Sequence, residues 1–191
     1  MPPDMRKTLG GLAAVLGMLV AGEADAQFAN RSLGGGLGFV KILSTGCGSS
    51  TSCVQLDFAA PLTLEGSLYV ENGFDVFLHV PVMIVKVSAG AAGTVTGEGF
   101  VFGTGGNLGV RYLFAEESIR PYLGIQLAGI VVLTTPEVGV LVGPGIIAGL
   151  DFFVTDTVSI GGRGFFNLFI QGLNVPVRPS FGGGIGVATY F

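Results

Sequence analysis

The sequence has no tryptophan, one histidine, two cysteines and few charged residues. Charged residues make up 12% of the 191-residue chain, whereas a soluble domain carries about 25%. Of the nine lysines and arginines, Arg6 and Lys7 lie in the first 26 residues and the other seven form no cluster. Because phosphate binding needs grouped basic residues, we expect no nucleic-acid partner.

The same scarcity argues against a metal or nucleotide site. Zinc needs four ligands, and the only histidine, His79, is far in sequence from Cys47 and Cys53. The glycine run 34–38 lacks the Gly-Lys-Ser/Thr ending of a phosphate loop. We therefore expect no metal and no cofactor.

The chain begins with the features of a secretory signal. Arg6 and Lys7 precede an apolar run over 9–22, and Ala24-Asp25-Ala26 is a small-x-small cleavage site. A membrane-anchoring helix needs about 20 apolar residues, which this run does not reach. The prediction is a cleavable signal peptide over 1–26 and one domain over 27–191. Export through an oxidising compartment favours a disulfide between Cys47 and Cys53.

Apolar side chains alternate with small or polar ones along most of the mature chain, which is the period of a β-strand. The alternation predicts eight strands over 31–43, 54–70, 74–87, 105–114, 119–132, 144–154, 158–170 and 181–191. The links over 71–73, 115–118 and 155–157 are short, and those over 44–52, 88–104, 133–143 and 171–180 are longer. This strict alternation of short and long links is typical of an outer-membrane barrel.

Three of the expected hairpins agree on which side chains share a face. Pairing 70 with 74, 114 with 119 and 154 with 158 keeps apolar residues together on one side. That side is expected to face lipid and includes Leu37, Phe39, Leu78, Val80, Val82, Ile125, Leu127, Ile146, Leu150, Phe166 and Leu168. Strands with an apolar outer face must close into a ring, because hydrocarbon leaves no backbone group unpaired.

Two other architectures compete with this one. A helical membrane protein would need an apolar run that Pro136 and Pro144 interrupt in the best candidate span. A soluble β-sandwich would carry polar residues on one face of its strands, and these strands do not. The prediction is an all-β, eight-stranded antiparallel up-and-down transmembrane barrel.

The last eleven residues, Phe-Gly-Gly-Gly-Ile-Gly-Val-Ala-Thr-Tyr-Phe, alternate in the same way and end on Phe191. With its strand pattern, the chain resembles small bacterial outer-membrane barrels of the OmpA/OmpX type. The resemblance implies a bacterial outer-membrane location with both termini periplasmic. It also implies contact with outer-membrane lipid and reading of Phe191 by the barrel-assembly machinery.

The inward face is expected to carry a polar, charge-balanced network within a closed lumen, because eight strands leave an interior that side chains about fill. Its members are Glu65, His79, Asn107, Arg111, Gln126, Asp151, Arg163 and Asn167. We expect Glu65 to pair with His79 or Arg111, and Asp151 with Arg163. Aromatic residues that we expect near the periplasmic rim are Tyr69, Phe74, Tyr112, Phe114, Tyr122, Phe152, Phe153, Tyr190 and Phe191.

A structural or surface-interaction role without catalysis fits these features best. His79 could act as a general base with Ser67 and Asp75 nearby, but a filled lumen offers no cleft for a lipid substrate. A narrow channel for small or hydrophobic solutes is the second hypothesis. A subunit of an envelope-spanning complex, with a surface or envelope protein as partner, is a further one.

Overall fold

The computed structural model describes residues 31–43, 53–91, 94–114, 118–133, 138–170 and 177–191. The strands are β1 (Arg31–Ile42), β2 (Cys53–Glu71), β3 (Phe74–Ala91), β4 (Thr94–Leu113), β5 (Ile119–Leu133), β6 (Val138–Phe153), β7 (Val158–Phe169) and β8 (Arg178–Tyr190). Within these ranges no helix is long and apolar enough to cross a membrane. The predicted signal peptide and Cys47 lie outside the described residues, so cleavage and the Cys47–Cys53 disulfide stay predictions.

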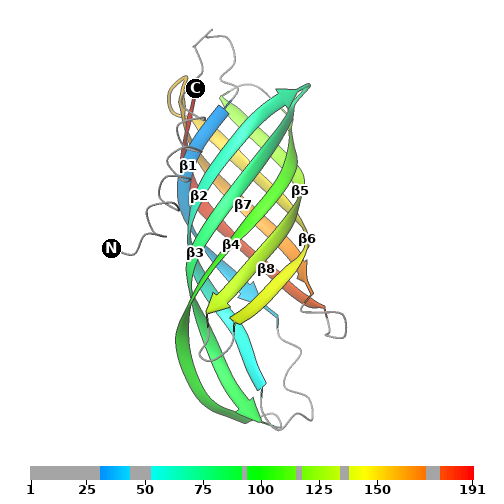
Figure 1. The fold of residues 1–191 in the computed structure, drawn as a ribbon. Helices are drawn as coiled ribbons and strands as arrows, with labels where there is room; N and C mark the ends of the chain where they lie inside the picture. Colours follow the sequence, from blue (N-terminus) through cyan, green and yellow to red (C-terminus); the bar gives the residue numbers. More distant parts are fainter. Residues whose placement is uncertain (1–30, 44–52, 92–93, 115–117, 134–137, 171–176) are drawn as a thin grey trace, which may run out of the picture.

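Each strand pairs antiparallel with its neighbour in sequence, and β1 pairs with β8 to close the barrel. The closing contact runs to the chain end, where Arg31 and Phe191 exchange backbone hydrogen bonds of 3.2 and 2.9 Å. The predicted eight-stranded up-and-down barrel is therefore confirmed. We call the end with Arg31, Tyr190 and the short links the turn end, and the opposite end the loop end (Figure 1).

The turn between β2 and β3 is tighter than the three-residue link predicted. Glu71 pairs with Phe74, so only Asn72 and Gly73 connect the strands, with φ of 53° and 84°. A two-residue turn with positive φ at both positions matches the twist of the flanking strands and favours Asn-Gly. The Gly73 N–H also donates to the hydroxyl of Tyr69 at 2.9 Å.

The predicted face of each strand is confirmed, and one predicted register is wrong. Leu68 lies opposite Val76, and Phe152 lies opposite Ile160, as expected. In the β4–β5 hairpin, Val110 pairs with Ile125 instead of Leu123. A shift of two residues moves the pairing without moving any side chain to the other face.

The largest error of sequence reasoning is at the loop end. The segment over 88–104 was predicted as a loop, but β3 runs to Ala91 and β4 begins at Thr94. Glycine disfavours a strand locally, yet pairing with β3 satisfies the backbone groups of this stretch. β6 and β8 also begin earlier than predicted, at Val138 and Arg178.

As a result β2, β3 and β4 outreach their neighbours. β1 pairs with β2 only as far as Lys41–Phe58, and the β4–β5 pairing begins at Phe102–Leu133. Residues 53–57 of β2 and 94–101 of β4 therefore continue past β1 and β5, with 85–91 of β3 between them, and we call these three segments the β2–β4 ribbon. Figure 1 shows it as the cyan and green extension at the lower end of the barrel.

The outward face is apolar and carries aromatic residues near both ends. At the turn end Phe74 contacts Tyr112, and Tyr112 contacts Phe114, both edge to face with ring centroids 5.2 Å apart. Toward the loop end, exposed outward phenylalanines are Phe39, Phe58, Phe102, Phe166 and Phe181. Of the aromatics expected at the rim, Tyr122 and Tyr190 are instead buried in the lumen. Two aromatic rings around an apolar band are typical of outer-membrane barrels.

Candidate functional site in the barrel lumen

The turn-end half of the lumen contains a network of charged and hydroxyl side chains, which we call the plug. Its centre is Arg111 on β4, which is 1% exposed. Arg111 Nε donates to Asp75 Oδ2 at 2.9 Å, and Nη2 lies 2.7 Å from the same oxygen. Asp75 is adjacent to Arg111 in the β3–β4 register, so the pairing of the strands fixes this ion pair.

Arg111 also contacts three uncharged side chains. Its Nη2 donates to Ser67 Oγ at 3.4 Å, and Ser67 shares a 2.7 Å hydrogen bond with Ser32. The guanidinium carbon lies 4.7 Å from the ring centre of Tyr122 and 5.7 Å from that of Phe77. A buried guanidinium with this many partners has little freedom to move.

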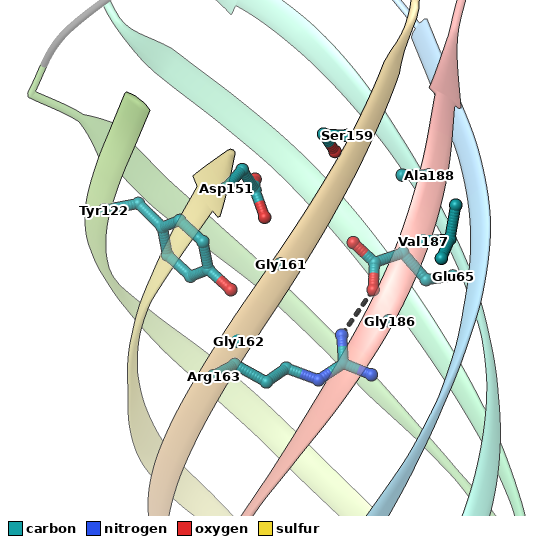
Figure 2. A pocket seen from close by; sticks show the side chains of 10 residues that line it. All are labelled: Glu65, Tyr122, Asp151, Ser159, Gly161, Gly162, Arg163, Gly186, Val187 and Ala188. Atoms are coloured by element: carbon teal, nitrogen blue, oxygen red, sulfur yellow. Dashed lines mark hydrogen bonds and ion pairs between the residues drawn. The ribbon is translucent and has the colours of Figure 1, made fainter. Parts of the chain in front are cut away.

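Glu65 on β2 connects two guanidiniums that come from different sides of the barrel. Its Oε1 lies 3.7 Å from Arg111 Nη1, and its Oε2 accepts a hydrogen bond from Arg163 Nη1. Figure 2 shows Arg163 reaching from β7 toward Glu65, with Asp151 and Tyr122 on the opposite wall. The bridge therefore crosses the lumen rather than joining neighbouring strands.

His79 lies within the same bridge. Its Nε2 is 3.0 Å from Arg163 Nη1 and 3.6 Å from Glu65 Oε2. The imidazole stacks on Phe77, with ring centroids 4.5 Å apart and planes inclined by 29°. At 2% exposure, His79 is a buried member of a packed network.

Asp151 has a different partner from the expected one. We expected an ion pair with Arg163, but Arg163 pairs with Glu65, and the Tyr190 hydroxyl donates to Asp151 Oδ2 at 3.4 Å. The register explains this, because Asp151 lies opposite Gly161 and Arg163 lies two residues farther toward the loop end. Nearby, Arg120 stacks over Phe153 at 4.1 Å.

The remaining predicted members form the edge of the plug that faces the loop end. Gln126 Nε2 donates to Asn167 Oδ1 at 2.7 Å, which joins β5 to β7 across the lumen. Asn107 lies opposite His79 in the β3–β4 register. Sequence reasoning did not include Ser32, Asp75 or Tyr190 in the network, although their inward parity was already implied by the strand pattern.

Between the plug and the loop end the lumen is mostly apolar, whereas a polar interior was expected. The buried cluster in this half comprises Val40, Ile42, Leu56, Ala59, Met83, Val85, Ala128, Ile130, Val132, Leu141 and Phe169. Stretches such as 82–85 and 130–133, with apolar residues on both faces, were the available signal. We call this region the apolar half.

Glycines make room for the large rings of the lumen. A Cβ added to Gly109 would lie 2.5 Å from Cζ of Phe77, and one added to Gly182 would lie 2.5 Å from Cζ of Phe165. Two cavities that remain are small. One of about 20 Å³ lies between Glu65 and Asp151, and one of about 40 Å³ lies where His79 and Gln126 meet the apolar half. Each holds a few waters at most.

Within the described residues no group of three or more His, Cys, Asp or Glu side chains is placed to hold a metal. The charges of the plug are directed at one another, and the two cavities beside them are small.

Searches found no matching protein family and no matching curated protein. Solved structures do resemble the chain. The outer membrane protein OprG from Pseudomonas aeruginosa matches with a TM-score of 0.63 at 12% identity, covering 88% of this chain and 99% of that one.

Neisserial surface protein A (NspA) has a TM-score of 0.54 at 16% identity, covering 86% and 99% of the two chains. Ail of Yersinia pestis, the attachment invasion locus protein, in complex with the heparin analogue sucrose octasulfate, has a TM-score of 0.52 at 13% identity, covering 84% and 97%. The chain therefore has the eight-stranded barrel fold of these outer-membrane proteins.

Proposed function

We propose that this protein is a non-enzymatic outer-membrane barrel that presents the β2–β4 ribbon outside the cell as a structural or interaction surface. The observation that carries the proposal is the contrast between a blocked lumen and strands that outreach the barrel. In this reading the turn end faces the periplasm, Phe191 serves barrel assembly and the outward apolar face contacts lipid.

The lengths of the strands support exposure of the ribbon. A tilted strand crosses the apolar core of a bilayer in about ten residues. Starting from Phe74 in the turn-end aromatic ring, ten residues lead to Ile84, beside Phe102. Residues 85–91 and 94–101 then extend beyond the apolar core, and surfaces and loops there commonly bind other molecules.

The edges of the ribbon offer backbone groups to a partner. Within the described residues, β4 from Thr94 to Val101 pairs only with β3. An edge of this kind can accept an extended segment of another protein.

The names of two structural relatives agree with such a role, since one is a surface protein and the other an attachment protein. The plug argues against catalysis, because a general base must be able to reach its substrate. His79 is buried between Arg163 and Glu65, and the Ser67 hydroxyl is shared by Ser32 and Arg111.

Conductance in planar bilayers separates this proposal from the channel hypothesis. We expect the purified full-length protein to give no steady unitary currents, because Glu65, Arg111 and Arg163 block the lumen. Steady currents that change in Glu65→Ala or Arg111→Ala would show a conducting path and contradict the proposal. Shortening of the ribbon, with residues 86–100 replaced by Asn-Gly, should leave folding unchanged and should give no steady currents either.

The ribbon would also provide the contact surface for a protein partner within an envelope complex. Co-purification after crosslinking from the native membrane, compared between the full-length and ribbon-shortened proteins, tests it. Partners retained equally by both proteins would argue against the ribbon as the interaction surface.

A further inference from the structure

The ionised side chains of the plug do not balance one another. The described plug contains three carboxylates and two guanidiniums, which belong to Glu65, Asp75, Asp151, Arg111 and Arg163. Ion pairs join Arg111 to both Asp75 and Glu65, and a further one joins Arg163 to Glu65. No ion pair among the described residues includes Asp151. One negative charge is therefore left over, and it lies on Asp151.

Two neighbouring basic side chains do not supply the missing positive charge. His79 Nε2 lies 3.0 Å from Arg163 Nη1, and because a guanidinium can only donate, this nitrogen accepts and the imidazole is neutral. Arg120 lies opposite Asp151 in the β5–β6 register, but its guanidinium stacks over the ring of Phe153 and forms no ion pair with a described carboxylate.

Asp151 is also buried, since its exposed fraction is 9%. The Tyr190 hydroxyl is 3.4 Å from its Oδ2, which is longer than an ordinary hydrogen bond between oxygens. Its Oδ1 lies against Gly161, where an added Cβ would collide with this oxygen. A buried carboxylate without a counter-charge is strongly unfavourable, so a positive charge is needed beside Asp151.

The cavity of about 20 Å³ in the plug lies at this position. Its polar lining includes the carboxylates of Glu65 and Asp151 and the hydroxyls of Tyr122 and Ser159. Figure 2 shows the oxygens of Asp151, Tyr122 and Glu65 directed into one space, with the Arg163 guanidinium at its side and bound to Glu65. The volume admits one particle of about the size of a water molecule.

We propose that this cavity binds one monovalent alkali cation, such as Na⁺, through Asp151 and the hydroxyls of Tyr122 and Ser159. Hard cations prefer carboxylate, hydroxyl and carbonyl oxygens. A charge of +1 balances the plug, whereas a divalent ion would leave an excess positive charge beside two guanidiniums. Such a site needs no histidine or cysteine, the ligands whose scarcity argued against zinc. The proposal is independent of the interaction role of the ribbon.

Reversible urea unfolding of the full-length protein in phosphatidylcholine vesicles tests the site, with NaCl compared with N-methylglucamine chloride at equal ionic strength. N-methylglucamine is too large for the cavity. An ion that binds only the folded state stabilises it by mass action, so the urea midpoint should be higher in NaCl and should rise with Na⁺ concentration. Asp151→Asn should abolish this difference. In N-methylglucamine chloride it should not lower the midpoint, because it removes an unbalanced charge.

Two further variants and a direct measurement support the test. Tyr122→Phe removes one oxygen but keeps the ring beside Arg111, and it should raise the Na⁺ concentration for half of the effect about fivefold. Glu98→Gln removes an exposed carboxylate of the ribbon, 2.8 Å from Lys86 Nζ, and should keep the full effect. Sodium NMR relaxation should be faster with the unmodified protein than with Tyr122→Phe, which decides the matter even if Asp151→Asn does not fold.

Three results would overturn the proposal. A midpoint that does not depend on Na⁺ would show that a proton balances Asp151 instead. An equal gain from NaCl in Asp151→Asn would show a general effect of salt. Equal sodium relaxation with the unmodified protein and Tyr122→Phe would show that the cavity does not hold the ion.

Discussion

In the turn-end half of the lumen, charged and hydroxyl groups hold one another in fixed directions, whereas the apolar half is filled by aliphatic and aromatic side chains. Arg111, for example, contacts Asp75, Ser67 and Glu65. Val85 and Ile130 lie nearer the loop end, and their side chains have no polar group that needs a hydrogen-bond partner. Both halves fill the same narrow cylinder, so the difference lies in how each responds to the loss of one side chain.

A buried ion pair depends on both partners, because a lone charge in the lumen keeps its desolvation cost. Apolar packing does not depend on a matched partner, and the stability lost on truncation scales with the side-chain volume removed. Deletions in the plug should therefore be severe singly and milder in matched pairs, whereas deletions in the apolar half should be graded. The following predictions use reversible urea unfolding in lipid vesicles.

The largest effect is expected for Arg111→Met. It leaves the Asp75 carboxylate, which is 3% exposed, without its guanidinium. The free energy of unfolding should fall by about 3–5 kcal/mol. The double variant Arg111→Met/Asp75→Leu should recover most of this loss, and a double variant as unstable as the single one would show that the pair is not the cause.

A smaller loss is expected for Gln126→Leu. The substitution removes the 2.7 Å hydrogen bond and leaves Asn167 Oδ1 without its donor, in a side chain that is 2% exposed. The expected cost is about 1–2 kcal/mol. Adding Asn167→Leu should restore stability, and an additive further loss would contradict a coupled pair.

In the apolar half, Ile130→Val should lower the free energy of unfolding by about 0.5–1.5 kcal/mol. The change removes one methylene from a side chain that is 5% exposed and adds no unsatisfied group. A loss as large as that of Arg111→Met would show that the two halves do not differ in the way we infer.

The smallest effect is expected outside the lumen. Lys86→Ala breaks an ion pair whose side chains are 35% and 55% exposed, and such pairs contribute little because water and salt screen them. The urea midpoint should not change measurably. A clear loss of stability would mean that the ribbon supports the barrel more strongly than its exposure suggests.

The sequence predicted the barrel because lipid imposes a strict alternation that glycine and aromatic residues do not obscure. Arg111, Gln126 and Asp151 could be placed inward from parity alone. Their partners could not be predicted. Glu65 meets Arg163 across the lumen, and the pattern along one strand does not show which residues of distant strands lie close together. The start of β4 was missed because its glycines resemble a loop, and only pairing with β3 makes them a strand.

The apolar half could have been predicted with more weight on parity. In the stretch 82–85, Val82 and Ile84 point outward, and the equally apolar Met83 and Val85 point inward.

Closure between the first and last strands tests the central claim most directly, because the filled lumen and the two faces both depend on it. Leu37 and Ile185 lie opposite each other on β1 and β8, and they are 65% and 71% exposed. With Cys47 and Cys53 changed to serine, Leu37→Cys/Ile185→Cys in native membranes should be joined efficiently by a short thiol crosslinker, while Leu37→Cys/Ile125→Cys should not. Equal crosslinking of both pairs, or of neither, would contradict a closed barrel in this register.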